Sequence, residues 1–221
     1  MLIVFDLDDT LYLERDYAFS GFRAVDRYLE ARGTKGLYSY ATALFLDGVR
    51  GTIFDGALKA LRVEIAEELI QELVRVYREH VPTIQLAPDA IACLSALKDR
   101  HELALITDGP SASQWRKIEA LGLGRFISKI IVTDDLGSDY WKPSRKPFEM
   151  AQGRRDPRDC VYVGDNPGKD FVAPRALGWR SIRICRKDGL HTLTEDDVAA
   201  PAHVKLTSLV DLSAALDPRS R

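Results

Sequence analysis

Four short apolar runs, each followed by a polar residue or a glycine, constrain the fold of this chain more than any other feature of its sequence. The runs are Leu2–Phe5 before Asp6, Leu103–Ile106 before Thr107, Ile130–Val132 before Thr133, and Cys160–Val163 before Gly164. Strands of a parallel sheet are apolar along their whole length because helices cover both faces of the sheet. Stretches with helical patterning lie between the runs, so the sequence predicts an α/β fold: a Rossmann-like open parallel sheet flanked by helices.

Further elements extend this alternation of strands and helices toward the C-terminus. The predicted helices are Pro88–Arg100, Ser111–Leu121, Pro147–Arg154, Ala173–Leu177 and Leu209–Leu216, and the added strands are Ser181–Cys185 and Val204–Leu206. The tail from Asp217 to Arg221 is expected to fray, as chain termini commonly do.

One interval is too long for this alternation. About 95 residues separate the first apolar run from the second, whereas a crossover between parallel strands needs only about a dozen. The interval has helical patterning throughout, with predicted helices at Tyr17–Ala31, Leu37–Val49, Ala57–Leu61 and Ile65–His80 and a glycine-bounded link at Arg50–Gly56. We therefore predict a catalytic core of residues 1–14 and 84–221, with residues 15–83 inserted as an α-helical cap subdomain.

The composition excludes several classes of protein. Of the 221 residues, 46% are hydrophobic and 29% charged, which favours a globular domain over a disordered chain. The 33 acidic and 31 basic side chains leave a net charge of −2, so neither nucleic acid nor a membrane surface is an expected partner. Three dispersed cysteines, with no basic leader and no long apolar stretch, favour a reducing, cytoplasmic location.

Carboxylates gather where two of the predicted strands end. Asp6 and Asp8 follow the first strand, and Asp165 and Asp170 follow the fourth. Ligands of open parallel sheets bind beyond the carboxyl ends of the strands, so these four side chains are expected to meet there. Like charges at short distance resist simultaneous ionisation, and a hard divalent cation such as Mg²⁺ would relieve that conflict.

Groups that suit a phosphate are predicted at the same edge of the sheet. Thr107, Asp108 and Gly109 follow the second strand and offer a hydroxyl and backbone N–H groups near a helix start. Lys142, in the segment between the third and fourth strands, supplies a cation. Carboxylates, a metal ion, a hydroxyl and a lysine together indicate phosphoryl transfer, in which positioning and charge neutralisation provide most of the catalysis.

Each of these motifs alone is common as a helix cap or a turn, but their order along the chain is specific. In that order the sequence resembles the haloacid dehalogenase superfamily of aspartate-nucleophile phosphohydrolases. The resemblance covers nearly the whole chain and rests on Asp6, Asp8 and Thr10 of DxDxT, on Thr107, on Lys142 before a proline, and on Gly164, Asp165 and Asp170 of GDxxxxD. A helical cap inserted after the first motif is also a feature of this superfamily.

The resemblance implies a role for each matched residue. Asp6 would attack phosphorus, and Asp8 would act as general acid and then as general base. Asp6, the main-chain carbonyl of Asp8, and Asp165 would hold Mg²⁺, and Asp170 would be a further ligand, directly or through water. Thr107, Asp108 and Gly109 would bind the phosphoryl oxygens together with Lys142, which would also neutralise Asp6.

Two lysines compete for the third motif. Lys142 and Lys146 both precede a proline, four residues apart. In the superfamily an aromatic residue follows the lysine–proline pair at a spacing that Phe148 meets for Lys142. We therefore prefer Lys142 and keep Lys146 as the alternative.

Within the superfamily, the resemblance favours a phosphatase. Dehalogenases and phosphonate hydrolases lack an aspartate at the position of Asp8, and mutases tend to lack a threonine at the position of Thr10. The expected substrate is a small phosphorylated metabolite, either a sugar phosphate or a nucleoside monophosphate. The alternatives are a phosphomutase of the same superfamily and a non-catalytic ligand-binding or regulatory member; the protein is expected to be a monomer or a homodimer.

The substrate would be read by the predicted cap and the segments that join it to the core. An arginine there could hold a second anionic group, and aromatic rings could stack on a sugar or a base. Arg50 is the residue that we assign to this role. Further candidates in the same region are Tyr12, Arg15, Tyr17, Phe22, Arg23, Thr52 and Phe54.

Overall fold

Six parallel strands form the sheet at the centre of the larger part of the molecule. The computed structural model describes residues 1–191 and 200–217. The strands are β1 (Leu2–Phe5), β2 (Glu102–Thr107), β3 (Lys129–Val132), β4 (Cys160–Gly164), β5 (Arg180–Ile184) and β6 (Val204–Leu206), in the spatial order β3-β2-β1-β4-β5-β6. The predicted α/β fold with an open parallel sheet is confirmed.

The register of the strands aligns their carboxyl ends. Phe5 at the end of β1 pairs with Leu105 of β2 on one side and with Val163 of β4 on the other. Asp6, Thr107 and Asp165 therefore leave the sheet at neighbouring points of one edge. The order of the strands places β1 between β2 and β4, which puts Asp6 in the middle of that edge.

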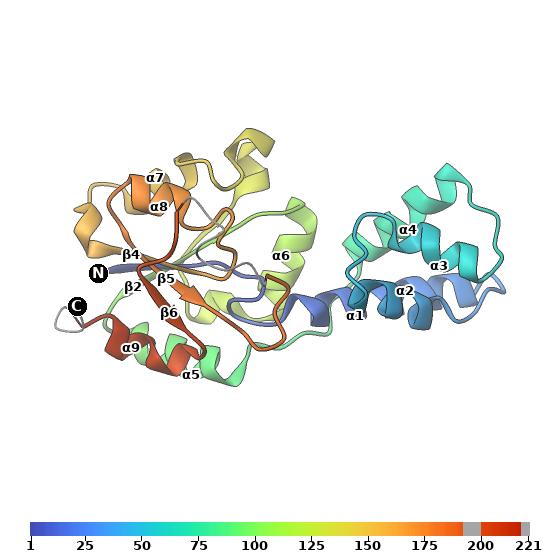
Figure 1. The fold of residues 1–221 in the computed structure, drawn as a ribbon, viewed down its shortest axis with the longest axis horizontal. Helices are drawn as coiled ribbons and strands as arrows, with labels where there is room; N and C mark the ends of the chain where they lie inside the picture. Colours follow the sequence, from blue (N-terminus) through green and yellow to red (C-terminus); the bar gives the residue numbers. More distant parts are fainter. Residues whose placement is uncertain (192–199, 218–221) are drawn as a thin grey trace. The chain divides into compact units, whose positions relative to one another are not determined.

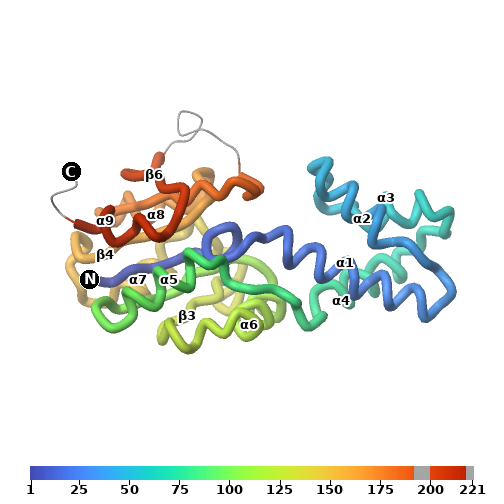
Figure 2. Tube along the Cα trace, turned by 90° about the horizontal axis from the view of Figure 1, so that it is seen from below, coloured from blue at the N-terminus to red at the C-terminus, as the bar shows by residue number. Residues whose placement is uncertain are grey.

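Helices cover both faces of this sheet, as the apolar strands require. They are α5 (Pro88–Leu97), α6 (Ser111–Ala120), α7 (Lys146–Gln152), α8 (Val172–Ala176) and α9 (Leu212–Ala215). In Figure 1, α7 and α8 lie on one side of the sheet and α5 and α9 on the other. Helices α5 and α9 are more than 100 residues apart in the sequence and lie side by side, as Figure 2 also shows.

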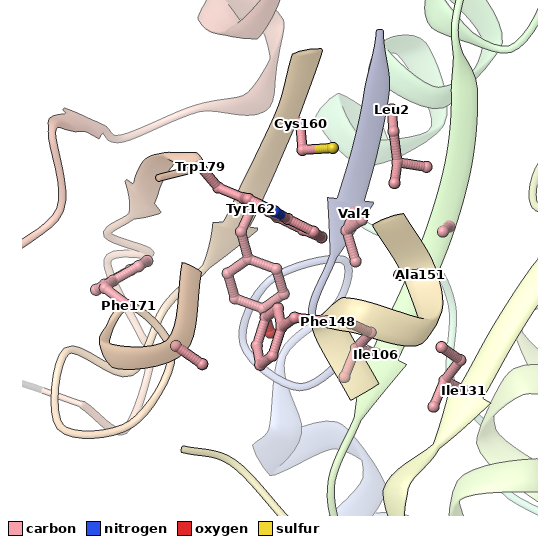
Figure 3. Packing of buried hydrophobic residues seen from close by; sticks show 12 residues of the cluster. Leu2, Val4, Ile106, Ile131, Phe148, Ala151, Cys160, Tyr162, Phe171 and Trp179 are labelled. Carbon is pink, nitrogen blue, oxygen red and sulfur yellow. The ribbon is translucent and has the colours of Figure 1, made fainter. Parts of the chain in front are cut away.

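A cluster of large side chains fills the face of the sheet that α7 and α8 cover. Phe148 of α7 is fully buried; its ring lies edge-on to that of Tyr162 at 5.0 Å between centroids and to that of Trp179 at 5.8 Å. Figure 3 shows these rings packed beside Leu2 and Val4 of β1. The Trp179 indole N–H donates to Gln152 Oε1 at 2.7 Å, so its one polar atom is satisfied.

Loss of the Phe148 ring should therefore be costly. Phe148→Ala is expected to lower the free energy of unfolding by about 3–5 kcal/mol, because it removes buried apolar surface and leaves a cavity. Met150→Ala, on the exposed side of the same helix, should cost less than about 0.5 kcal/mol. Urea unfolding of both variants measures this, and equal losses would contradict the packing described here.

The second part of the molecule is a separate helical unit. The chain divides into one unit of Met1–Glu14 with residues from Gln85 onward, and another of Arg15–Ile84. The helices are α1 (Glu14–Glu30), which begins at the last residue of the first unit, and α2 (Leu37–Leu46), α3 (Ile53–Ala60) and α4 (Glu67–Glu79). Six aromatic side chains pack against one another in this helical unit, the last two half-buried: Tyr17, Phe22, Phe45, Phe54, Phe19 and Tyr77.

Two glycines of the helical unit lie at close contacts between helices. A Cβ atom on Gly21 of α1 would lie 2.4 Å from the Tyr77 ring, and one on Gly56 of α3 would lie 2.8 Å from Leu44 Cδ1. The prediction of a glycine-bounded link over Arg50–Gly56 was wrong at its end, because α3 already begins at Ile53. Gly56 serves the approach of α3 to α2 rather than a turn.

Among the residues that the structure describes, no helix is long and apolar enough to cross a membrane.

The start of α5 is tied to two distant segments through one carboxylate. Asp89 accepts from Arg186 Nη1 at 3.1 Å to each oxygen and from the backbone N–H of Leu209 at 2.9 Å. Burial by itself raises the pKa of Asp89, but the Leu209 hydrogen bond and the charge of Arg186 outweigh burial and lower that pKa below its ordinary value. The ionised carboxylate therefore stabilises the fold.

The stabilisation by Asp89 should depend on pH. Its contribution is complete above the unfolded-state pKa of about 3.9 and is lost as the pH falls through the lower folded-state value. Asp89→Asn is expected to reduce the free energy of unfolding at pH 7 by about 1–2 kcal/mol. Urea unfolding at several pH values should show this difference shrink below about pH 4; a difference that grew on acidification would contradict the assignment.

Candidate active site

Four segments bring polar side chains together at the carboxyl edge of the sheet. Three of these segments directly follow β1, β2 and β4. The fourth comes after β3 and contains Lys142. The amine of Lys142 lies 2.6 Å from Asp6 Oδ1 and 2.8 Å from Asp170 Oδ1, and its Nζ donates to the Tyr162 hydroxyl at 3.0 Å. The Lys142 side chain is 1% exposed. The structure thus places Lys142 among the predicted carboxylates, whereas Lys146 is exposed at the start of α7.

Three carboxylates share this buried position, and the Lys142 ammonium group contacts two of them, Asp6 and Asp170. One oxygen each of Asp6, Asp165 and Asp170 lie within 4.8 Å of one another. Burial raises the pKa of Asp6 to about 7, against the charge of Lys142 and with a further rise from Asp170. The pKa of Asp165 is raised well above its usual range by burial and by the charges of Asp170 and Asp6. Three ionised carboxylates would carry more negative charge than Lys142 neutralises, and the raised pKa values reflect that conflict, which a divalent cation would relieve.

The GDxxxxD segment has a steric reason for its glycine. A Cβ atom on Gly164 would lie 2.5 Å from Asp170 Oδ2, so only glycine lets that carboxylate reach the cluster. The same Asp170 oxygen accepts from the backbone N–H of Asn166 at 2.9 Å, which closes the segment on itself. Asp165 and Asp170 are brought to the same place by this turn.

The segment after β2 is held by hydrogen bonds from its neighbours. Thr107 is buried, and its hydroxyl donates to Gln114 Oε1 at 3.0 Å. The Asp108 carboxylate accepts from Thr133 Oγ1 at 2.8 Å, from the Lys142 backbone N–H at 3.1 Å and from Lys169 Nζ at 2.9 Å. These bonds connect the ends of β2, β3 and β4.

Comparison with known proteins identifies the family to which this chain belongs. The sequence profile of a hydrolase family, the haloacid dehalogenase-like hydrolases, matches residues 1–178. The chain belongs to this family. The membership predicted from the four motifs is thereby confirmed.

Relatives of this haloacid dehalogenase-like hydrolase include named phosphatases. A glyceraldehyde 3-phosphate phosphatase of Methanocaldococcus jannaschii is 28% identical over 221 residues, covering 95% of each chain. A phosphoserine phosphatase of Thermus thermophilus is 31% identical over 186 residues, covering 82% of this chain and 70% of its own. The fold is that of the HAD-hydrolase YfnB from Bacillus subtilis bound to magnesium, with a TM-score of 0.71, 18% identity and 98% of each chain covered.

The hydrolase site contains polar side chains that sequence reasoning missed. Lys117 of α6 places its amine 2.8 and 2.9 Å from the two carboxylate oxygens of Asp8, and Gln114 Nε2 lies 3.5 Å from Asp8 Oδ2. Burial alone would raise the pKa of Asp8, but the charge and hydrogen bonds of Lys117 lower it below its ordinary value. Nothing in the sequence marks Lys117 and Gln114, because both lie on a helix that also has exposed charged residues.

The predicted substrate-binding residue Arg50 belongs to the helical unit and has partners there. Its Nη1 donates to the carbonyl oxygens of Phe45 at 2.8 Å and Val49 at 2.7 Å, and its guanidinium lies 4.0 Å from the centre of the Phe45 ring. Phe22 and Phe54, two further candidates, are buried in the aromatic interior of that unit. Tyr12 instead belongs to the core, where its hydroxyl donates to Asp8 Oδ1.

The two lysines that precede a proline can be separated by stability measurements. Lys142→Met leaves Asp6 and Asp170 buried without their shared ammonium partner, and should lower the free energy of unfolding in EDTA by about 3 kcal/mol. Lys146→Met removes an exposed charge and should change it by less than about 0.5 kcal/mol. Guanidinium unfolding at pH 8 compares the two, and a larger loss for Lys146→Met would overturn this placement.

Proposed function

We propose that this chain is a Mg²⁺-dependent phosphatase that hydrolyses a small phosphorylated metabolite through an aspartyl-phosphate on Asp6. The observation that carries the proposal is the meeting of Asp6, Asp165, Asp170 and Lys142 in one buried cluster, with Asp8 two residues from the nucleophile. Nucleophile, cation and metal-binding carboxylates are the groups that phosphoryl transfer needs.

The donor set supports magnesium. Asp6, Asp165 and Asp170 are buried, offer hard oxygen atoms and have more negative charge than Lys142 balances. The main-chain carbonyl of Asp8 is a further proposed ligand. Magnesium bound by these groups would neutralise the phosphoryl oxygens and keep Asp6 ionised at neutral pH.

The reaction proceeds in two displacements at phosphorus. In the first, an Asp6 carboxylate oxygen forms a bond to phosphorus while the bond to the ester oxygen breaks, and Asp8 gives the leaving oxygen its proton. In the second, a water oxygen attacks the same phosphorus, the bond to Asp6 breaks, and Asp8 takes the water's proton. Inorganic phosphate and the alcohol are the products.

The remaining residues of the edge bind the phosphoryl group. We assign the Thr107 hydroxyl and the backbone N–H groups of Asp108 and Gly109 to the phosphoryl oxygens, with Lys142 as the cation. Gly109 has φ +126°, and a Cβ atom there would lie 2.6 Å from Gln114 Nε2, so the backbone can take this course only with glycine.

The relatives support the class of substrate. Their names state glyceraldehyde 3-phosphate and phosphoserine, both small phosphate monoesters, and the first is a three-carbon sugar phosphate. We therefore propose a small phosphorylated metabolite, with sugar phosphates ahead of nucleoside monophosphates. Arg50 as a contact for a second anionic group stays a prediction.

The first experiment is an assay of p-nitrophenyl phosphate hydrolysis. Magnesium-dependent release of phosphate is expected, with loss in EDTA and a loss of at least about 1,000-fold in Asp6→Asn, because the amide is a poor nucleophile. Asp99→Asn, an exposed aspartate outside the site, is the matched control and should keep full activity.

Two outcomes would contradict the proposed function. Full activity in Asp6→Asn would exclude the aspartyl-phosphate. Binding of Mg²⁺ and phosphate without turnover of a broad panel of esters would favour a non-catalytic member of the family, and transfer of the phosphoryl group to a second sugar hydroxyl in place of water would indicate a phosphomutase.

A further inference from the structure

A second buried lysine faces the site from α6. Lys117 is 4% exposed, although lysines are almost never buried unless they are paired. Its amine contacts both carboxylate oxygens of Asp8, at 2.8 and 2.9 Å, across 109 positions of sequence. An ammonium group in contact with both oxygens holds the position of the carboxylate by charge-assisted hydrogen bonds.

Two neutral side chains complete the surroundings of this carboxylate. The Tyr12 hydroxyl donates to Asp8 Oδ1, and Gln114 Nε2 lies 3.5 Å from Asp8 Oδ2. Hydrogen-bond donors from the segment after β1 and from α6 therefore lie at both oxygens of Asp8, which limits the orientations that its carboxylate can take. Gln114 also accepts from the Thr107 hydroxyl at 3.0 Å, so α6 connects Asp8 to the proposed phosphate-binding threonine.

Two other charged groups, Glu14 and Lys169, interact electrostatically with the pair of Asp8 and Lys117. Burial raises the pKa of Glu14 to about 7, with the charge of Asp8 adding to the rise and that of Lys117 opposing it. Lys169 acts on Asp8 more weakly than Lys117 does, and its amine is in contact with Asp108 at 2.9 Å. Lys117 contacts Asp8 directly.

We propose that Lys117 is a positioning residue that holds Asp8 as an oriented base for the second displacement, the hydrolysis of the aspartyl-phosphate. This inference rests on the proposed function. In that step the water oxygen bonds to phosphorus, the bond from phosphorus to Asp6 breaks, and the water's proton passes to Asp8, which restores the acid for the next first displacement. Lys117 touches neither phosphorus nor the water and acts through Asp8.

If Lys117 acts in this way, its loss should affect the rates of the two displacements differently. With p-nitrophenyl phosphate the leaving group is stable as an anion, so the first displacement needs no proton from Asp8. The second displacement needs the base with every substrate. Loss of Lys117 should therefore slow only the second step, and the aspartyl-phosphate should accumulate.

The test is rapid-mixing and steady-state kinetics of Lys117→Met with p-nitrophenyl phosphate and Mg²⁺. We expect kcat to fall about 10- to 100-fold and KM to fall in parallel, because the general base contributes on the order of 100-fold or more. The ratio kcat/KM, which reports the first displacement, should stay within about threefold, and a burst of one nitrophenolate per enzyme should precede the slow phase.

Companion variants separate positioning from a loss of structure. Lys117→Arg keeps the cation and should restore most of kcat, whereas Arg116→Met, the neighbouring change on α6, should leave all parameters unchanged. Tyr12→Phe removes a weaker donor to Asp8 and should give the same split on a smaller scale of about threefold. If thermal unfolding shows that Lys117→Met does not fold, Tyr12→Phe provides the test.

Defined results would overturn the proposal. Equal losses of kcat and kcat/KM without a burst in a folded Lys117→Met or Tyr12→Phe variant would refute it, as would full activity of Lys117→Met. These results are distinct from failure of the proposed function, which would appear as retained activity in Asp6→Asn or as a wild-type protein without turnover.

Discussion

The buried contact between Lys142 and the two carboxylates of Asp6 and Asp170 is the constraint on which the site depends. Each of these three groups would be costly to bury alone, and the cost of an unpaired charge far exceeds that of an unpaired neutral group. The chain tolerates them because β1, the end of β4 and the segment after β3 converge at one sheet edge. The charge that Lys142 leaves unbalanced is what makes the cluster suitable for magnesium.

The pairing of a carboxylate with a buried lysine recurs two residues further along the chain. Asp8 is paired with the buried Lys117, so the two aspartates of the first motif have separate cations from separate segments. Asp6 is left with a raised pKa and Asp8 with a lowered one, although they are two residues apart. Different surroundings thus shift the pKa values of neighbouring carboxylates in opposite directions.

Much of the fold and of the carboxylate cluster could be predicted from the sequence, because the residues that indicate them lie close together in the chain. A strand buried on both faces must be apolar along its length, so β1, β2 and β4 are readable as runs, and the acidic residues after β1 and β4 follow from the chain direction. The family motifs add the roles that we propose for Asp6, Asp8 and Asp165. The start of α3 was misjudged because Gly56 indicates a turn when only the sequence is seen, whereas in the structure it lies within a helix, beside Leu44.

The sequence by itself determined the parallel sheet, the inserted helical segment and the carboxylates at the strand ends, since each depends on residues close together in the chain. Only the tertiary structure decided that Lys142 lies against Asp6 while Lys146 is exposed, and that Lys117 reaches Asp8 across 109 positions. The physical reason is that a buried charge is tolerated only beside an opposite one. Which lysine meets which aspartate is set by the packing of distant segments.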